Sequence, residues 1–277
     1  MFNRKKINFN GFLVVSGVHL TLLVLILVFT SCNQNGTPNN SKNKLNEQNE
    51  IEISDSILEE IHKNIYENPF AAREKALKIL DSIGQGNPEA RIRLLKHIGS
   101  SYVFETNYSE AIKYYNQALS LAEEINLYSE IAHINNNLGV IFNEIGNYKT
   151  AYIHFVESLN NYDLADKKEK KIGALNNIGL IYMNMNNYEK ALSYFNEVIH
   201  SKAQPTDTIL VVSALNNIAI CYISEKKPER ALEYIEKAIS LSEKVNNQYG
   251  LCISHQLMGN LYLELGQPPK AKEAYQA

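Results

Sequence analysis

One short pattern recurs at every fortieth position through most of the chain. Each copy has a small residue, which we call the marker residue, followed by an aromatic three positions later, an alanine at twelve and a bulky residue at sixteen. A fixed period of this size is typical of stacked helical hairpins, so the pattern predicts an all-α fold. The marker residues are Gly99, Gly139, Gly179, Ala219 and Gly259. The bulky residues are Tyr115, Phe155, Phe195, Ile235 and Tyr275.

The spacing indicates how the two helices of each copy pack. The aromatic and the bulky residue are expected on the inner faces of two successive helices, and the marker residue lets the backbones approach closely. Each hairpin then buries one side against its own partner helix and another against the next hairpin. Turn-prone pairs such as Asn107-Tyr108 and Asn147-Tyr148 stand between the helices. The expected architecture is an α-solenoid of stacked antiparallel helix pairs.

The copies resemble the tetratricopeptide repeat family in the segments LGVIFNEIGNYKTAYIHF, IGLIYMNMNNYEKALSYF and IAICYISEKKPERALEYI. The resemblance covers roughly residues 92 to 277. The chain lacks the family's tryptophan, and its copies run to 40 residues instead of about 34. That length is similar to the elongated repeats of kinesin light chains and related peptide-binding scaffolds. The resemblance implies a right-handed superhelix whose concave groove binds an extended peptide or a partner protein.

The start of the chain has the form of a bacterial export signal. Basic residues at 4–6 precede an apolar run at 12–29, which small residues and Cys32 follow. This arrangement resembles a lipoprotein processing site, where cleavage would leave Cys32 as an acylated amino terminus. An uncleaved transmembrane anchor is the alternative, although His19 interrupts the run. Both interpretations tether the chain to a bacterial membrane, and we expect it to face the periplasm.

The sequence divides into four parts. We predict a lipoprotein-type signal at 1–31, an asparagine-rich flexible tether at 32–50, a degenerate helical capping pair at 51–83, and five repeat units of equal period at 84–277, the last incomplete. The tether has too little apolar surface to offset the entropy of ordering. Pro69 is expected to separate the two helices of the capping pair. Because the last unit stops within its second helix, without a solvating cap, we expect the natural product to be longer.

Paired asparagines stand three and two residues before the marker in three consecutive copies. Asparagine is a poor helix former, so its recurrence within a helix needs an explanation. By the helical wheel, the pairs lie on or beside the concave wall, where an amide can both donate to and accept from the main chain of an extended peptide. Asparagines at these places bind peptide main chains in the family, which implies that role first for Asn137, Asn177 and Asn217 and second for Asn136, Asn176 and Asn216.

A structural role is the alternative for the same six side chains. In that case the amides bond to one another or to neighbouring carbonyls and fix the register of the hairpins, because buried polar groups need partners. His97 and His133 stand near the same wall and are expected to be solvated. Cys221 and Cys252 are expected to be two buried thiols rather than a disulfide.

Other function classes lack their usual signals. A formal net charge of -3 and the absence of a Lys/Arg cluster in the repeats argue against nucleic acid as a partner. No two histidines lie one helical turn apart, so we expect no metal site. No nucleophile elbow, phosphate loop or paired-carboxylate motif is present, and we expect neither an enzyme nor a cofactor.

Three functions fit the sequence. The first is a membrane-tethered scaffold for protein-protein interaction, with a peptide or a partner protein in the groove. The second is the extracytoplasmic sensing part of a longer signalling protein, such as a histidine kinase or a transcriptional regulator. The third is a glycan-capturing outer-membrane lipoprotein, which is disfavoured because the chain has no tryptophan for an aromatic platform.

Overall fold

The computed structural model describes residues 55–201 and 207–277, and it places twelve α-helices and one short 3-10 helix in them. The predicted signal, Cys32 and the tether lie outside these residues. The described parts contain no β-strand, so the all-α prediction is confirmed. Among them, no helix combines the length and the apolar character needed to cross a membrane. The four predicted part boundaries stay predictions.

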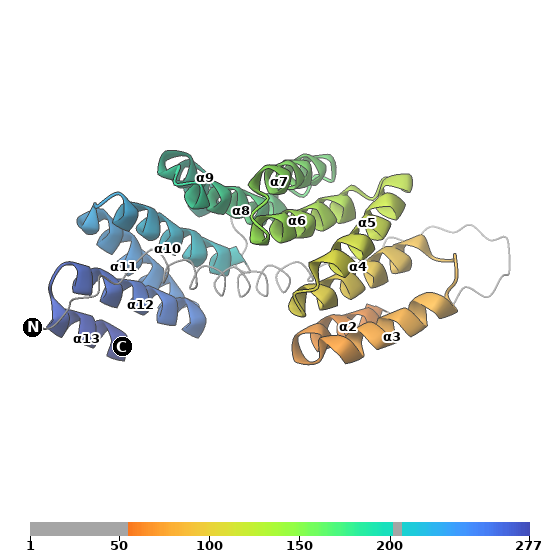
Figure 1. The fold of residues 1–277 in the computed structure, drawn as a ribbon, viewed down its shortest axis with the longest axis horizontal. Coiled ribbons are helices and arrows are strands. Elements are labelled where there is room, and N and C mark those ends of the chain that lie inside the picture. The colour runs from red at the N-terminus through yellow and green to blue at the C-terminus, as the bar shows by residue number, and fades with distance from the viewer. Residues whose placement is uncertain (1–54, 202–206) are drawn as a thin grey trace, which may run out of the picture. The chain divides into compact units, whose positions relative to one another are not determined.

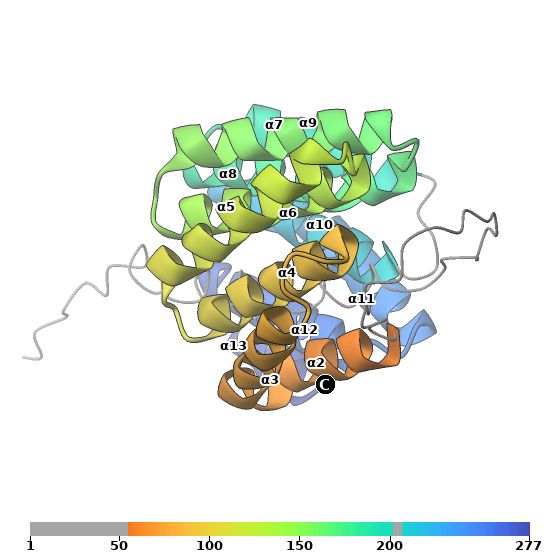
Figure 2. The same ribbon diagram turned by 90° about the vertical axis from the view of Figure 1, so that its right-hand side faces the viewer.

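The helices fall into two compact units, which we describe separately; the boundary between them in the chain falls within α9. The two helices of a pair pack against each other, as α6 does with α7 and α10 with α11 (Figure 1). In the N-terminal unit, α2 and α3 both pack against α4 (Figure 2). The N-terminal unit contains α2 (Asp55–Glu67), α3 (Pro69–Ser82), α4 (Pro88–Phe104), α5 (Tyr108–Glu124), α6 (Tyr128–Glu144), α7 (Tyr148–Leu164), η1 (Lys168–Lys170), α8 (Lys171–Asn184) and the start of α9 (Tyr188–His200). The C-terminal unit contains the rest of α9, α10 (Thr208–Ser224), α11 (Pro228–Lys244), α12 (Gln248–Glu264) and α13 (Pro268–Gln276).

The described turns that follow α4 and later helices share one backbone geometry. In each of these turns, the residue just before the N-cap of the following helix has a positive φ, as Gly146 does. The N–H of the N-cap residue then donates to the carbonyl five residues earlier, as that of Asn147 does to Phe142 over 2.8 Å. This pairing closes the last turn of the preceding helix. The Asn147 side chain then accepts from the N–H of Thr150 at 3.2 Å, which caps α7. The positive-φ residues stand at every twentieth position, with 206 outside the described residues: Thr106, Asn126, Gly146, Asp166, Asn186, Lys226, Asn246 and Gly266.

The closest approach within a pair is between the marker glycine and the bulky residue sixteen positions later. A methyl group on Gly139 would lie 2.6 Å from the Phe155 ring, and one on Gly99 would lie 3.0 Å from the Tyr115 ring. Both rings are fully buried. The fourth marker is Ala219, and its bulky residue is the aliphatic Ile235. Within this chain, a bulky residue that is aromatic therefore occurs only in copies whose marker residue is glycine.

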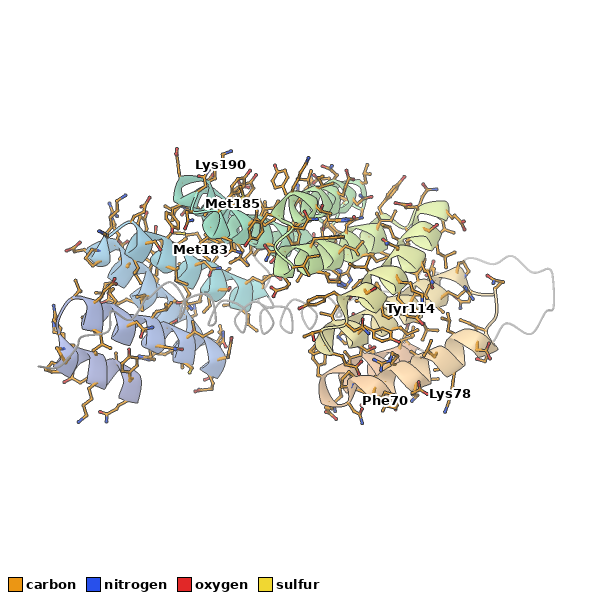
Figure 3. The ribbon with its side chains drawn as sticks, viewed as in Figure 1. Phe70, Lys78, Tyr114, Met183, Met185 and Lys190 are labelled. Atoms are coloured by element: carbon orange, nitrogen blue, oxygen red, sulfur yellow. The ribbon has the colours of Figure 1, made fainter. Side chains whose placement is uncertain are left out.

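A second contact repeats beside this one. In the first four copies, the aromatic three residues after the marker packs against a ring fifteen residues after the marker, on the second helix of the pair. In the first copy, Tyr114 on α5, labelled in Figure 3, supplies the ring on the second helix. Ring centroids lie 5.3 to 5.6 Å apart in the pairs Tyr102–Tyr114, Phe142–His154, Tyr182–Tyr194 and Tyr222–Tyr234.

The capping pair joins the first repeat through Arg73 on α3. Its guanidinium lies 4.2 Å from the centroid of the Tyr102 ring and pairs with Glu105 at 2.8 Å. Phe70 on α3, also labelled in Figure 3, has the same guanidinium 5.4 Å from its ring centroid. A buried arginine between two rings and a carboxylate fixes α3 against α4 by geometry as well as by charge.

We predict that Gly139→Ala lowers the free energy of unfolding by about 1–3 kcal/mol, because the added methyl overpacks a filled core. Gly259→Ala is the matched control. Its methyl would also meet an aromatic ring, that of Tyr275, but this ring is 47% exposed and can move away. The helix propensity of alanine, about 1 kcal/mol better than that of glycine, should then leave the control neutral or stabilised. Urea unfolding of both variants measures the difference, and equal losses would contradict the explanation.

Candidate functional site

The first helices of successive pairs contact one another and form one face in each unit. In the N-terminal unit, α2, α4, α6 and α8 pack in this order, and in the C-terminal unit α10 packs on α12. We call these faces the first-helix walls. All six asparagines predicted to bind a peptide lie on these helices. The walls therefore carry all the residues predicted to bind a peptide.

The six asparagine side chains are buried rather than exposed. Asn177 is the most accessible at 7%, while Asn137, Asn176 and Asn217 are at 2%, 0% and 1%. The helical wheel predicted that these residues lie on or beside the concave wall, and it did not show that they are buried. A ligand would reach them only in a narrow space between helices.

Three of the six amides have side-chain partners on the neighbouring first helix. Asn177 Nδ2 donates to Asn136 Oδ1 over 3.2 Å, which joins α8 to α6. The Asn216 amide lies 2.9 Å from Ser254 Oγ, which joins α10 to α12. These contacts are those of the structural interpretation, since each fixes the register of two consecutive pairs.

The other three asparagines, Asn137, Asn176 and Asn217, have no partner with good hydrogen-bond geometry for either amide atom among the described residues. Asn137 lies close enough to the Tyr115 hydroxyl to affect its pKa. Burial raises that pKa, and the hydroxyl's contacts with Ser100 and Asn137 oppose the rise. A buried amide without a partner destabilises the protein by about 1–3 kcal/mol. These three amides are the ones that a ligand or a water molecule could satisfy, and their role in peptide binding stays a prediction.

A small pocket of about 20 Å³, partly open to solvent, lies between α10 and α12 in the C-terminal unit. Ile209, Leu210 and Val212 on α10 and Ile253 on α12 supply its apolar walls, and Asn217 lines it as well. It brings one of the unpaired amides to a space with room for about one water molecule. No single segment of the sequence signals this pocket, because its two sides come from different copies of the repeat.

A cluster of ionisable side chains occupies the wall of the N-terminal unit. Lys96 Nζ donates to Glu130 over 2.5 Å and lies 3.0 Å from Nδ1 of His133, so the cluster spans α4 and α6. His97 extends it to α2, where its ring centroid lies 5.3 Å from that of His62. Lys96 is only 9% exposed, and such a charge is kept buried by its carboxylate partner.

His97 and His133 are half-buried among the other groups of this cluster, whereas the sequence-based expectation was that they are solvated. Burial, together with the charge of Lys96, holds the pKa of His97 well below its usual value. Burial and Lys96 also lower the pKa of His133, to about 3, although Glu130 opposes the shift. Burial alone would raise the pKa of Glu130, but Lys96 and His133 outweigh it and bring that pKa to about 2. At neutral pH Lys96 and Glu130 form an ion pair, and the imidazoles of His97 and His133 are uncharged.

The two cysteines differ from each other. Cys221 is buried, which raises the pKa of its thiol to about 12, whereas Cys252 is exposed. The expectation of two buried thiols is therefore wrong for Cys252, and no disulfide joins the two. In the parts of the chain that the structure describes, no group of three or more side chains is suited to holding a metal ion.

We predict that the fold loses stability as the pH falls from about 6.5. The pKa values of His97 and His133 are lower in the folded protein than in the unfolded chain, so the unfolded chain binds more protons in this range. Each such imidazole contributes a slope of about 1.4 kcal/mol per pH unit, and Glu130 adds to the loss below about pH 4.5. The double variant His97→Gln, His133→Gln should flatten the slope of melting temperature against pH. His200→Gln, at an exposed position, is the control that should leave the slope unchanged.

The comparisons with known proteins agree with this architecture. Tetratricopeptide repeat family profiles match residues 92–125, 173–200 and 210–277. No curated protein matches the sequence. Among solved structures, BtubC (BKLC) from P. vanneervenii is similar at 18% identity and a TM-score of 0.63, with 76% of this chain and 88% of that chain covered. The apo form of the quorum sensor NprR from B. thuringiensis is similar at 16% identity and a TM-score of 0.65, with 79% and 62% covered.

Two further solved structures have the same helical fold. NprR in complex with its cognate peptide NprX is similar at 16% identity and a TM-score of 0.59, with 79% of this chain and 64% of that chain covered. The pilF protein of Pseudomonas aeruginosa is similar at 18% identity and a TM-score of 0.57, with 79% and 87% covered. This chain thus spans less than two thirds of NprR. On the repeated helix pairs, the family matches and the shared fold, the chain belongs to the tetratricopeptide repeat family.

Proposed function

We propose that this protein is a membrane-tethered scaffold that binds an extended peptide, or an extended segment of a partner protein, along its first-helix walls. The observation that carries the proposal is the set of buried, unpaired amides on those walls, at Asn137, Asn176 and Asn217. The similar fold of NprR, whose structure with its cognate peptide is known, supports a peptide as the ligand class.

The chemistry of the amides favours a main chain over other ligands. A primary amide offers two donor hydrogens and an acceptor oxygen, and a peptide group offers one donor and one acceptor in complementary positions. A water molecule could fill the same role at a single site, but it would add no affinity for a partner. Each amide contact would contribute about 1 kcal/mol, so useful affinity requires apolar contacts as well.

Three of the six asparagines already have side-chain partners, which leaves the other three for a ligand. Asn136, Asn177 and Asn216 already bond across neighbouring first helices and hold the walls together. Their partners leave little capacity for a ligand, so the proposal moves the peptide contacts of the Asn177 copy to Asn176. Each of the three copies thus has one unpaired asparagine among the two that the sequence predicted to bind a peptide.

The membrane tether is the second part of the proposal, and it rests on the sequence. Arg4 to Lys6, the apolar run at 12–29 and Cys32 have the order of a lipoprotein signal. A single acyl chain binds a membrane only marginally, so stable anchoring would need more than one chain at the processed cysteine. The tether would hold the repeats at the periplasmic face of a bacterial envelope, where a secreted or membrane-bound partner is accessible.

We predict that Asn217→Leu weakens peptide binding without loss of stability. Leucine keeps the branched shape of asparagine, its larger end can extend into the pocket that Asn217 lines, and it removes an unpaired buried amide. The melting temperature should therefore stay the same or rise. Affinity for peptides that the wild-type chain selects from a random phage-displayed library should fall about tenfold, as measured by fluorescence anisotropy.

Asn177→Leu is the matched control for this prediction. It breaks the hydrogen bond to Asn136 and leaves that amide unpaired, so the melting temperature should fall. If Asn217→Leu instead destabilised the protein and left peptide affinity intact, Asn217 would belong to the fold and not to the binding site. Failure of the wild-type chain to select any peptide would remove the support for a peptide ligand.

We predict that Cys32→Ala abolishes the incorporation of labelled palmitate when the full gene is expressed in a bacterial host, because the acylated sulfur is lost. Cys252→Ala is the control, since it removes an exposed thiol from α12 and should leave labelling unchanged. Label in the Cys32→Ala protein would contradict the lipoprotein assignment. An unlabelled variant that still sediments with membranes would identify the run at 12–29 as an uncleaved anchor.

A further inference from the structure

We infer that Lys96, Glu130 and His133 form a proton-sensitive latch between the α4–α5 pair and the α6–α7 pair. The latch joins the two pairs while His133 is uncharged and opens when His133 takes up a proton, so that an extended peptide on this wall is held at neutral pH and released in acid. The release of a peptide rests on the proposed function, because it assigns a regulation to part of the same site, whereas the opening of the wall does not.

The contacts of Lys96 determine which nitrogen of His133 carries a hydrogen. Lys96 Nζ on α4 lies 2.5 Å from Oε2 of Glu130 and 3.0 Å from Nδ1 of His133, both on α6. An ammonium group has three donor hydrogens and no acceptor, so Nδ1 must accept the bond. Neutral His133 therefore carries its hydrogen on Nε2, and one lysine of α4 bonds to two side chains of α6.

A second proton on His133 is incompatible with this arrangement. It would put an N–H on Nδ1, so that two donors and two positive charges faced each other across 3.0 Å. Glu130 is already paired with Lys96 and can neutralise only one of the two charges. The charged ring is relieved by moving to water, which separates α6 from α4. Because α5 stays packed on α4 and α7 on α6, each pair keeps its own core when the wall opens.

The groups around His133 favour its uncharged form. Burial and Lys96, followed by Lys170 and His62, lower its pKa to about 3, and Glu130 opposes them. The elements packed nearby supply these ionisable side chains: Lys96 and His97 on α4, Glu130 on α6, His62 on α2, Lys170 before α8, and on α7 His154, which lies 2.8 Å from Asn135. From α5, the apolar Ala118 and Ala122 pack in one core cluster with Ile131 and Ile134 of α6.

The direction and the size of the effect follow from proton linkage. In the open wall the pKa of His133 would return to about 6.5, the ordinary value for histidine. The open form then binds the proton more tightly than the closed form, so acid favours the open form. Between pH 7 and pH 5 the ratio of open to closed protein should rise about 25-fold through His133 alone.

The latch lies beside a proposed peptide contact. Asn137 follows His133 by one helical turn on α6, so both are on the same face of the helix. On α4, Ser100 donates to the carbonyl of Lys96 at 3.0 Å and lies 2.9 Å from the Tyr115 hydroxyl, which Asn137 also contacts. Separation of α4 from α6 would therefore move Asn137 and interrupt the wall along which an extended peptide lies.

Distances between spin labels test the opening without any ligand. Glu124→Cys and Leu164→Cys place labels on the exposed last residues of α5 and α7, in the full-length chain with Cys32→Ala and Cys252→Ala. Cys221 is buried and stays unlabelled. In detergent, pulsed electron paramagnetic resonance should show a second, longer distance at pH 5. The ratio of the longer to the shorter distance should rise about 25-fold from pH 7 to pH 5.

Two substitutions separate the latch from a general effect of acid. His133→Asn keeps an acceptor near the position of Nδ1 but takes up no proton, so the distances should be the same at both pH values. Lys96→Met removes the ammonium, and Glu130 can then neutralise a charged His133, so acid should leave the wall closed. Circular dichroism of the wild type and of His133→Asn should show the same helix content at both pH values.

Peptide affinities test the regulation. Peptides without ionisable side chains, selected from a phage-displayed library on the wild type at pH 7, should bind it more weakly at pH 5, by up to about 25-fold. The affinity of His133→Asn for the same peptides should not change between the two pH values.

The outcomes separate this inference from the proposed function. If the wild-type distances are the same at pH 7 and pH 5, or change equally in His133→Asn, the latch is wrong and the peptide scaffold stands. If the wall opens in acid but peptide affinity keeps its value, the regulation of binding is wrong. If the wild type selects no peptide, the proposed function fails, and the distances still decide whether the latch exists.

Discussion

The close approach of two helices at the marker glycine is the contact on which the rest of the structure depends. Where the facing residue is Tyr115 or Phe155, a buried ring occupies the space that a Cβ would fill. This contact fixes the distance between the helices of a pair, and the stacked rings beside it fix their rotation. With each pair rigid, its remaining faces present regular surfaces to the next pair, which is how repeat proteins build a continuous core from local contacts.

Asparagine has two different roles in this chain, and both depend on the hydrogen-bonding capacity of its short amide side chain. In turns such as that at Asn147, the short amide side chain accepts from the backbone at the start of a helix. On the first-helix walls it stands in the middle of helices, where it either bonds across pairs, as Asn177 does with Asn136, or stays unpaired. The turns need asparagine for local reasons, whereas the walls need it for contacts between copies or with a ligand.

The sequence predicted what is local and periodic. It predicted helix pairs, glycine at the marker and the turns, because each depends on residues within one copy. It did not predict the burial of Asn137 and Asn217, since burial depends on what the neighbouring pair covers. His97 and His133 were expected in solvent for the same reason. The group formed by Lys96, Glu130 and His133 joins positions far apart in the chain, and the pocket beside Asn217 has walls from two copies, so neither has a signal in any single segment.

The even spacing of the turns has a consequence for how such a gene can change. Because the described positive-φ residues from Thr106 to Gly266 stand at multiples of twenty positions, each helix together with its turn takes up an equal stretch of the chain. Recombination between two misaligned copies of the gene would therefore delete or duplicate a whole helix pair while every junction keeps its turn residues in phase. The number of copies can vary in this way without a new fold having to evolve, and the copy that carries a particular recognition surface can be gained or lost as one module.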